Sequence, residues 1–215
     1  MSHDGTVLAI DREQVGGNIR DASIRRRILV VAKHRFARFG FEETSLDDIA
    51  RSSDISETEL RAHFDNKRNI LTASLNEGWG PLNLRFAGIA RNSLRARDAM
   101  LSMLAFTANL MEQDEDFVRL FLFEGRRPDA ESSEISLSYG YRRFMQICAE
   151  IVIRGQKDGS FKQSLHPQVV ASMLVGAIEG MIRDRLVAEQ TGSITPYNGT
   201  YLMSAFDALV SSLQT

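Results

Sequence analysis

The sequence predicts an all-α protein with two domains, and three observations lead to this prediction. Apolar residues recur at steps of three and four along most of the 215 residues, which is the period of an amphipathic helix. The chain after residue 81 carries no strand signal. The segment from Gly78 to Pro81 is the clearest helix-breaking signal in the chain. We therefore expect an arm over residues 1–20, a smaller helical domain over 21–77 and a larger helical domain over 78–215.

The first predicted helix runs from Asp21 to Phe39, and Gly40 follows it as a stop signal. Its inward face should carry the apolar residues that recur at helical steps: Ile24, Ile28, Ala32, Phe36 and Phe39. Residues 1 to about 19 show no helical period and end near Gly16-Gly17. We therefore expect a flexible arm there.

A short helix is predicted to follow Ser45. The Ser45 hydroxyl can cap this helix, and Asp48 three residues later can complete a capping box. Leu46, Ile49 and Ala50 lie at the spacing of one apolar face.

A turn and a second short helix are predicted next. Residues 52 to 54 interrupt the first helix, and Asp54 is of a residue type that tolerates a left-handed turn. Ser56 can cap the second helix, with Glu59 closing a second capping box. Leu60 and Phe64 are expected to face inward. Two capped helices across a short turn constitute a helix-turn-helix motif.

The ordered residues of this segment resemble the DNA-binding domain of TetR-family transcriptional regulators. The resemblance is carried by Phe36, Gly40-Phe41, Thr44-Ser45, Asp48-Ile49-Ala50, Ile55-Ser56, Leu60, His63-Phe64, Asn66-Lys67 and Ile70-Leu71. It implies a recognition helix over Glu57 to Phe64, with Lys67 touching a DNA phosphate. The chain departs from the family at Asp54, where a glycine is usual, and at Arg61, where a tyrosine is usual.

We expect Arg61, Thr58 and Lys67 to contact double-stranded DNA, with Ser45 and His63 on phosphates. Arginine can pair with a guanine or with a phosphate through two hydrogen bonds, so Arg61 keeps a DNA-binding role. Glu57 and Glu59 are repelled by phosphates, although both favour the positive N-terminal end of their own helix.

Local charge qualifies this expectation. The net charge of the chain is -2, and the stretch from Glu42 to Glu59 holds seven acids against Arg51. Residues 20 to 38 hold seven basic residues against Asp21, and residues 61 to 68 hold three against Asp65, so phosphate attraction should come from these two flanks. The acidic stretch leaves one alternative open, a helical ligand- or partner-binding protein whose helix-turn-helix no longer engages DNA.

The second domain is predicted to be helical throughout. A helix over residues 67–77 is expected to complete the first domain. The helices expected in the second domain cover residues 82–93, 96–114, 115–124, 132–157, a segment beginning at His166-Pro167, and 201–213. The segment from Val169 to Ile182 has a broad apolar stripe, with Gly176 and Gly180 on one face. The resemblance implies that the last two helices form a homodimer, although core packing within one subunit would look similar.

The middle helices are rich in large apolar residues, which gives candidates for the wall of an effector pocket. We predict a ligand site at Phe86, Met103, Phe106, Phe121 and Phe144. Methionine and phenylalanine at helical spacing also occur in ordinary cores, so a filled interior stays open as the alternative. The residue types favour an apolar or aromatic small molecule.

Composition excludes several other functions. Cys148 is the only cysteine, so no intramolecular disulfide can form and a reducing compartment is expected. No apolar run approaches membrane-spanning length, and the N-terminus lacks a signal-peptide pattern; we expect a cytoplasmic protein that contacts no membrane. No catalytic, metal-binding or phosphate-binding constellation is present, so we predict no enzyme activity, metal or cofactor.

The sequence as a whole predicts a dimeric DNA-binding regulator, most simply a repressor, that leaves a near-palindromic operator when an effector binds.

Overall fold

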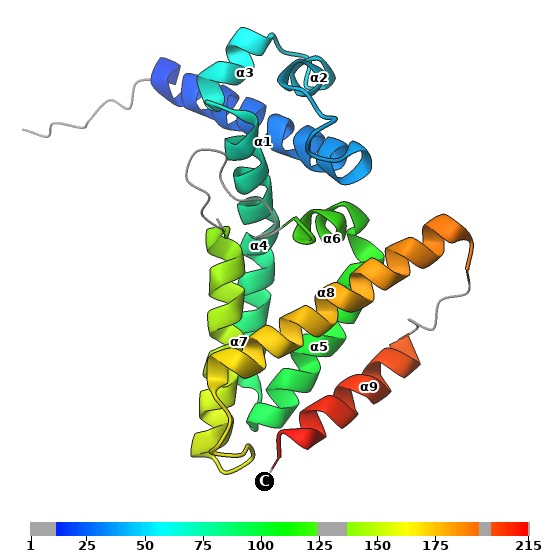
Figure 1. Ribbon diagram of the computed structural model, residues 1–215. Helices are drawn as coiled ribbons and strands as arrows, with labels where there is room; N and C mark the ends of the chain where they lie inside the picture. The colour runs from blue at the N-terminus through cyan, green and yellow to red at the C-terminus, as the bar shows by residue number, and fades with distance from the viewer. Residues whose placement is uncertain (1–11, 124–136, 194–198, 215) are drawn as a thin grey trace, which may run out of the picture. The chain divides into compact units, whose positions relative to one another are not determined.

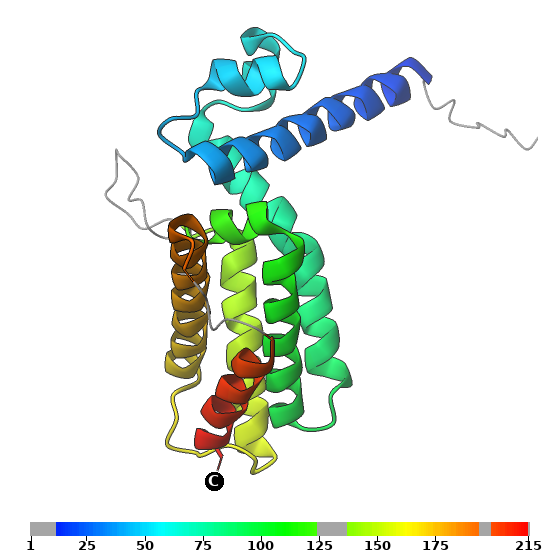
Figure 2. The same cartoon turned by 90° about the vertical axis from the view of Figure 1, so that its right-hand side faces the viewer.

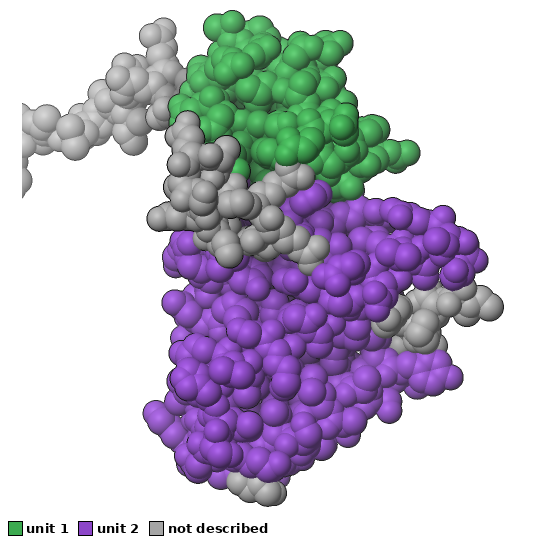
Figure 3. Space-filling view, in the orientation of Figure 1, with its two compact units in different colours: residues 1–71 green, residues 72–215 purple. Residues whose placement is uncertain are grey.

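The computed structural model describes residues 12–123, 137–193 and 199–214. Every regular element within these residues is an α-helix (Figure 1), which confirms the predicted all-α class. The chain divides into two compact units between Leu71 and Thr72 (Figure 3). The two units are described separately below.

The first unit contains α1 (Arg12–Phe39), α2 (Leu46–Ser52), α3 (Glu57–His63) and the first turn of α4 (Lys67–Asn92). The two short helices are held in place because each contributes apolar side chains to one small core. Its fully buried members come from all four helices: Ile28, Ala32, Phe36, Ile49, Leu60 and Ile70.

The start of α1 differs from the prediction. The helix begins at Arg12 and not at Asp21, so residues 12–20 are helical and the predicted arm is wrong for that part; residues 1–11 lie outside the described chain. Gly16 and Gly17 lower the helix propensity. Extending an existing helix, however, gains one hydrogen bond for each residue fixed, so elongation tolerates weak residues that would hinder nucleation.

Phe39 is a second correction within α1. Its helical spacing predicts an inward position, yet half of its surface (50%) is exposed. The Arg35 guanidinium lies 5.1 Å from the centre of its ring, so the ring is covered in part by a cation and not by the core.

The second unit contains the rest of α4 together with α5 (Ala96–Gln113), α6 (Glu115–Phe121), α7 (Tyr139–Lys157), α8 (Pro167–Thr191) and α9 (Gly199–Ser212). Helix α7 packs against both α5 and α8, α9 packs against α5, and the short α6 touches α5 and α8. Figure 1 shows α4 and α7 running side by side, and the hydrogen bonds of Gly140 described below join them. In Figure 2, the axes of α4, α5 and α7 are nearly aligned. None of the helices in the described part of the chain is long and apolar enough to cross a membrane.

The predicted break at Gly78 to Pro81 does not occur, because α4 continues through it to Asn92. A side-chain carbon at Gly78 would lie 2.2 Å from the ring of Phe117. The glycine therefore permits the ring to rest on the helix backbone and does not turn the chain. Pro81 lies inside the helix, where it costs one backbone hydrogen bond.

Helix α7 is fastened to α4 at Gly140. The Gly140 N–H donates to Asn76 Oδ1 at 3.0 Å, and the Gly140 carbonyl accepts from Asn83 Nδ2 at 2.8 Å. A side-chain carbon at Gly140 would lie 2.1 Å from Trp79 Cβ. The predicted start of this helix at Ser132 is wrong where it can be checked: Ser138 caps a helix that begins at Tyr139, and residues 132–136 lie outside the described chain.

Candidate nucleic-acid interface and ligand cavity

The N-terminus of α2 is held by the predicted capping box. Ser45 Oγ accepts from the Asp48 N–H at 3.0 Å, and Asp48 Oδ2 accepts from the Ser45 N–H at 3.2 Å and from the Ser45 hydroxyl at 2.6 Å. The hydroxyl bond, followed by the backbone bond, holds the pKa of Asp48 below its ordinary value. The Ser45 hydroxyl is thus already engaged at the helix end, and its contact with a phosphate stays a prediction.

The turn between α2 and α3 depends on Asp54. Its φ of 52° is left-handed, and no other non-glycine residue in the described chain has a positive φ. The expected tolerance of aspartate for this conformation is confirmed. Ser56 Oγ then accepts from the Glu59 N–H at 3.1 Å. Only this forward half of the second predicted capping box forms.

The exposed face of α3 carries Thr58 and Arg61. Arg61 donates from Nε and from Nη2 to Glu57 Oε1, at 2.9 and 2.6 Å. Glu57 therefore neutralises and orients the guanidinium one turn further along the same helix. This contact explains an acidic residue on the expected recognition helix, and it leaves further N–H groups of Arg61 available to a DNA base.

His63 and Lys67, unlike the exposed Thr58 and Arg61, make contacts with other parts of the first unit. The His63 side chain is only 8% exposed, and its Nε2 lies 3.6 Å from Asp21 Oδ1 on α1. Lys67 Nζ donates to the carbonyls of Phe41 and Glu42 at 2.6 and 3.2 Å, and burial lowers the pKa of Lys67. Both side chains thus serve contacts inside the unit, and their phosphate contacts stay predictions.

Two carboxylates of the acidic stretch, both on α2, are paired with nearby arginines. Arg51 pairs with Asp47 at 2.5 Å and with Asp48 at 3.4 Å, and Arg35 of α1 lies 3.5 Å from Asp48. A count along the sequence does not show this arrangement, because Arg35 belongs to a different helix. The repulsion of DNA by this stretch is therefore smaller than the count suggests.

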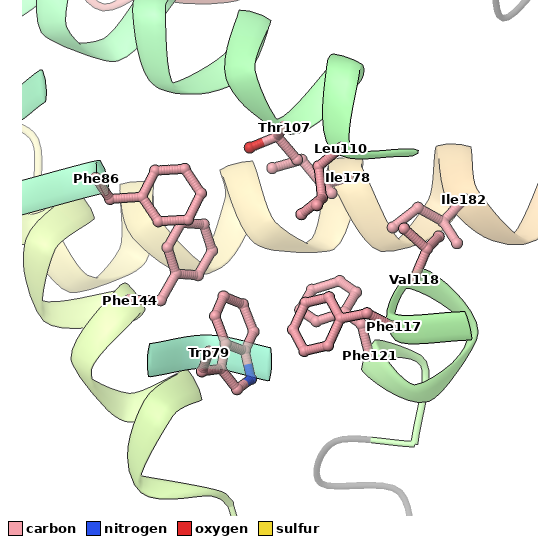
Figure 4. Close-up of a pocket in the computed structure, with 10 residues that line it drawn as sticks. All are labelled: Trp79, Phe86, Thr107, Leu110, Phe117, Val118, Phe121, Phe144, Ile178 and Ile182. Atoms are coloured by element: carbon pink, nitrogen blue, oxygen red, sulfur yellow. The ribbon is translucent and has the colours of Figure 1, made fainter. Parts of the chain in front are cut away.

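An apolar cavity of about 30 Å³ lies within the second unit (Figure 4). Three of the five predicted ligand residues line it: Phe86, Phe121 and Phe144. Met103 is buried one turn away from the lining residue Thr107 on α5, and the ring of Phe106 packs against Phe86 at 5.4 Å between ring centres. The remaining lining residues are Trp79, Thr107, Leu110, Phe117, Val118, Ile178 and Ile182.

The rings of this cavity are arranged around Trp79. Phe144 stacks on the indole at 5.1 Å between ring centres, and Phe117 and Phe121 meet it edge-on at 5.4 and 5.6 Å. Thr107 is the polar residue in the wall, and its hydroxyl donates to the Met103 carbonyl at 2.9 Å. The cavity surface is therefore entirely apolar.

Sequence reasoning missed the contribution of α8 to this wall. The sequence assigns Ile178 and Ile182 to the broad stripe of a dimerisation helix, whereas both are buried against the cavity. Their four-residue spacing cannot distinguish these two surfaces, since the stripe is wide enough for both. Thr107 was missed because the search followed apolar residues at helical spacing. The sequence does not show that its hydroxyl is bonded to a carbonyl of its own helix.

The remaining reactive group is Cys148, which is buried on α7. Burial raises the pKa of its thiol to about 12, so little thiolate forms near neutral pH. Within the described residues, no group of three or more histidine, cysteine, aspartate or glutamate side chains could hold a metal ion.

Comparison with known proteins places the helix-turn-helix in a family. Residues 28–73 match the model of the bacterial regulatory proteins of the tetR family. The HTH-type transcriptional repressor KstR2 of Rhodococcus jostii is 23% identical over 150 residues, covering 70% of this chain and 74% of that protein. The HTH-type transcriptional regulator SrpR of Pseudomonas putida is 26% identical over 167 residues, covering 75% of each chain.

Solved structures share the fold over nearly the whole chain. The transcriptional regulator FadR from Bacillus subtilis, solved in complex with stearoyl-CoA, has a TM-score of 0.75 at 18% identity and covers 88% of this chain and 99% of its own. The ketosteroid transcriptional regulator KstR2 of Mycobacterium tuberculosis has a TM-score of 0.63 at 18% identity, with 89% and 94% covered. At these identities the likeness establishes the fold.

Proposed function

We propose that this chain, which belongs to the tetR family of bacterial regulatory proteins, is a DNA-binding repressor that a small-molecule effector releases from its operator. One observation carries the DNA-binding part. The exposed face of α3 presents Thr58 and Arg61, and both helices of the motif are capped and joined through Asp54. Arg61, already oriented by Glu57, is suited to donate two hydrogen bonds to a guanine in the major groove.

A homodimer through α8 and α9 would place two copies of α3 on one DNA duplex. Apolar side chains on α8 lie open to solvent in the single chain: Val169 is 64% exposed, Met173 45% and Val187 52%. On the same helix, apart from the local helix backbone, no atom of the described residues lies within 4 Å of the side-chain positions of Gly176 and Gly180. A second helix could therefore approach closely, and the operator would be a near-palindrome with half-sites about 34 Å apart.

The aromatic cavity supports the effector part of the proposal. About 30 Å³ holds no more than one or two waters, so an effector must displace side chains when it enters. Phe117 and Phe121 both belong to α6, which is only seven residues long. A ligand that shifts α6 can bind one state of the protein better than the other, which is the condition for releasing DNA.

The test is selection of bound duplexes from a random DNA pool at near-physiological salt. Wild type should enrich a near-palindrome. Arg61→Ala should relax the preference at one position of each half-site by about 1–3 kcal/mol, whereas Lys67→Ala should weaken all sequences alike. Arg85→Ala, which removes a guanidinium from the second unit, is the matched control and should keep the wild-type motif.

No enriched sequence from a stable wild-type dimer would contradict the proposal. It would favour the alternative of a partner-binding protein whose helix-turn-helix no longer engages DNA. Equal losses from Arg61→Ala and Lys67→Ala on every sequence would instead contradict the division of their roles.

A further inference from the structure

A second cavity, of about 60 Å³, lies beside the aromatic one. The two cavities share Val118 of α6 and Ile182 of α8 as lining residues. Figure 4 shows this pair at the end of the aromatic cavity opposite Phe86. A modest displacement of these two side chains would join the cavities into one elongated site. The other lining residues of the second cavity are Glu112, Glu115, Arg185, Leu186 and Glu189.

The second cavity carries an excess of negative charge, because its lining holds three carboxylates and one guanidinium. Arg185 Nε donates to Glu189 at 2.9 Å, and Glu115 accepts at 2.9 Å from Arg119, which does not line the cavity. Glu112, on the last turn of α5, has no ion pair within the described residues. A cation entering this cavity would therefore find a carboxylate that no arginine of the described chain already neutralises.

The aromatic cavity also favours a cation over an anion, because of its aromatic rings. Five of its lining residues are aromatic: Trp79, Phe86, Phe117, Phe121 and Phe144. The face of an aromatic ring attracts a cation, most strongly for tryptophan. The rings thus accept an apolar body and also tolerate an attached positive charge.

From these two cavities we infer that the effector is a cationic amphiphile, with an apolar or aromatic body in the aromatic cavity and an amine or quaternary ammonium group at the acidic cavity. This inference rests on the proposed function, because it names the chemical class of the effector for the same site. It also predicts the charge of the ligand's head group, which the apolar lining of the aromatic cavity does not predict by itself. A carboxylate or phosphate ligand of the same apolar size would be repelled by Glu112, whose charge no arginine of the described chain neutralises, whereas Glu115 and Glu189 are already paired with Arg119 and Arg185.

The experiment compares three probes with one apolar body: 4-phenylbutylamine, 4-phenylbutanol and 4-phenylbutyrate. Trp79 is the only tryptophan of the chain and lies in the cavity wall, so its fluorescence reports entry into this site. Affinities are measured by titration at about pH 7, where the amine is protonated. We expect the amine to bind most tightly, the alcohol less tightly and the carboxylate least.

Charge variants separate the head group from the body. Glu112→Gln and Glu189→Gln should each weaken the amine by about two- to fivefold, as expected for partly exposed ion pairs, and should leave the alcohol nearly unchanged. The matched control is Glu150→Gln, which changes the net charge equally. Glu150 lies on α7, pairs with Arg143 at 2.9 Å and lines neither cavity, so the amine affinity should not change.

Three results would overturn the inference: a carboxylate probe that binds as tightly as the amine, an amine preference that survives both glutamine variants, or no response of Trp79 to any probe.

Binding of the selected operator duplex is followed in the same samples. Release of DNA by the carboxylate in preference to the amine would refute the cationic effector and leave the regulator standing. An amine preference without any specific DNA binding would refute the regulator and leave the charge preference standing.

Discussion

The helix-turn-helix segment and the aromatic cavity are stabilised by opposite means. In the first, each helix end is fixed by a polar side chain at the surface, as Ser45 and Asp48 are at the start of α2. In the second, aromatic rings lie directly against helix backbone, as Phe117 does at Gly78 and Trp79 does at Gly140. Hydrogen bonds of the first kind join residues three apart, whereas the bond between Gly140 and Asn76 joins residues 64 apart.

This difference separates the expected costs of mutation. A lost cap is partly replaced by water, because the helix end is exposed. A carbon atom added between Trp79 and the α7 backbone must displace neighbouring atoms, because protein interiors are close-packed. Changes in the cavity wall should therefore reduce stability more than changes in the caps.

The largest effect is expected from Gly140→Ala. The added carbon would meet Trp79 Cβ at 2.1 Å and Cγ at 2.5 Å, and the Cβ atom cannot move away without moving α4. We expect the second unit to lose about 3 kcal/mol of stability, at the upper end of the usual cost of overpacking. Urea unfolding followed by Trp79 fluorescence measures this loss, since the probe lies at the site of the change.

Gly88→Ala is the matched control for that experiment. Gly88 lies within the same helix α4, and among the described residues nothing beyond the local helix backbone would come within 4 Å of its added carbon. Replacing a helical glycine with alanine in open space should stabilise by about 0.5–1 kcal/mol. Equal effects of the two substitutions would show that the ring contact at Gly140 is not tight, and the comparison between the two regions would fail.

The two regions also differ in how far the sequence predicts them. The sequence predicts the helix-turn-helix nearly to the residue, including the cap at Ser45 and the left-handed Asp54, because these signals act within a few residues. The break predicted at Gly78 to Pro81 is wrong, because the same glycine that can end a helix can also seat the ring of Phe117. Only the packing partner distinguishes the two uses of a glycine.

The ligand cavity shows the same limit. Of the five residues that the sequence predicts for a ligand site, three line the cavity, whereas Met103 and Phe106 do not. Whether a buried residue faces a cavity or a neighbouring side chain depends on the distance between helices. The spacing of apolar residues along one helix does not reveal that distance. The bond from Lys67 to the Phe41 carbonyl is likewise invisible in the sequence, since it joins residues 26 apart.

A middle-sized effect is expected at the caps. Ser45→Ala removes the acceptor of the Asp48 N–H and the donor to its carboxylate, whereas Ser56→Ala removes one bond only. We expect a loss of about 1 kcal/mol for the first and a smaller loss for the second, within the usual range of capping substitutions. Hydrogen exchange of the amides in α2 and α3 measures each loss where it occurs.

The control for the caps is Ser204→Ala on the exposed face of α9, which should leave exchange in α2 and α3 unchanged. Equal losses at Ser45 and Ser56 would mean that the additional bond from the Ser45 hydroxyl to the Asp48 carboxylate adds nothing to stability. No loss from either substitution would mean that the two short helices are held by their buried residues alone.

The smallest effect is a dependence on pH that belongs to Asp48. Because bonding to Ser45 lowers the pKa of Asp48 in the folded state below its ordinary value of 3.8, the contribution of this carboxylate is fully present above that value. It should be lost as the pH falls through the lowered pKa, since the protonated group no longer accepts from both Ser45 donors. We therefore expect the thermal midpoint of wild type to exceed that of Asp48→Asn at about pH 6, and the difference to shrink by about pH 3. Ser45→Ala removes the largest cause of the shift, so the Asp48→Asn difference should be smaller in that background at the higher pH; a difference that grows on acidification would contradict the assignment.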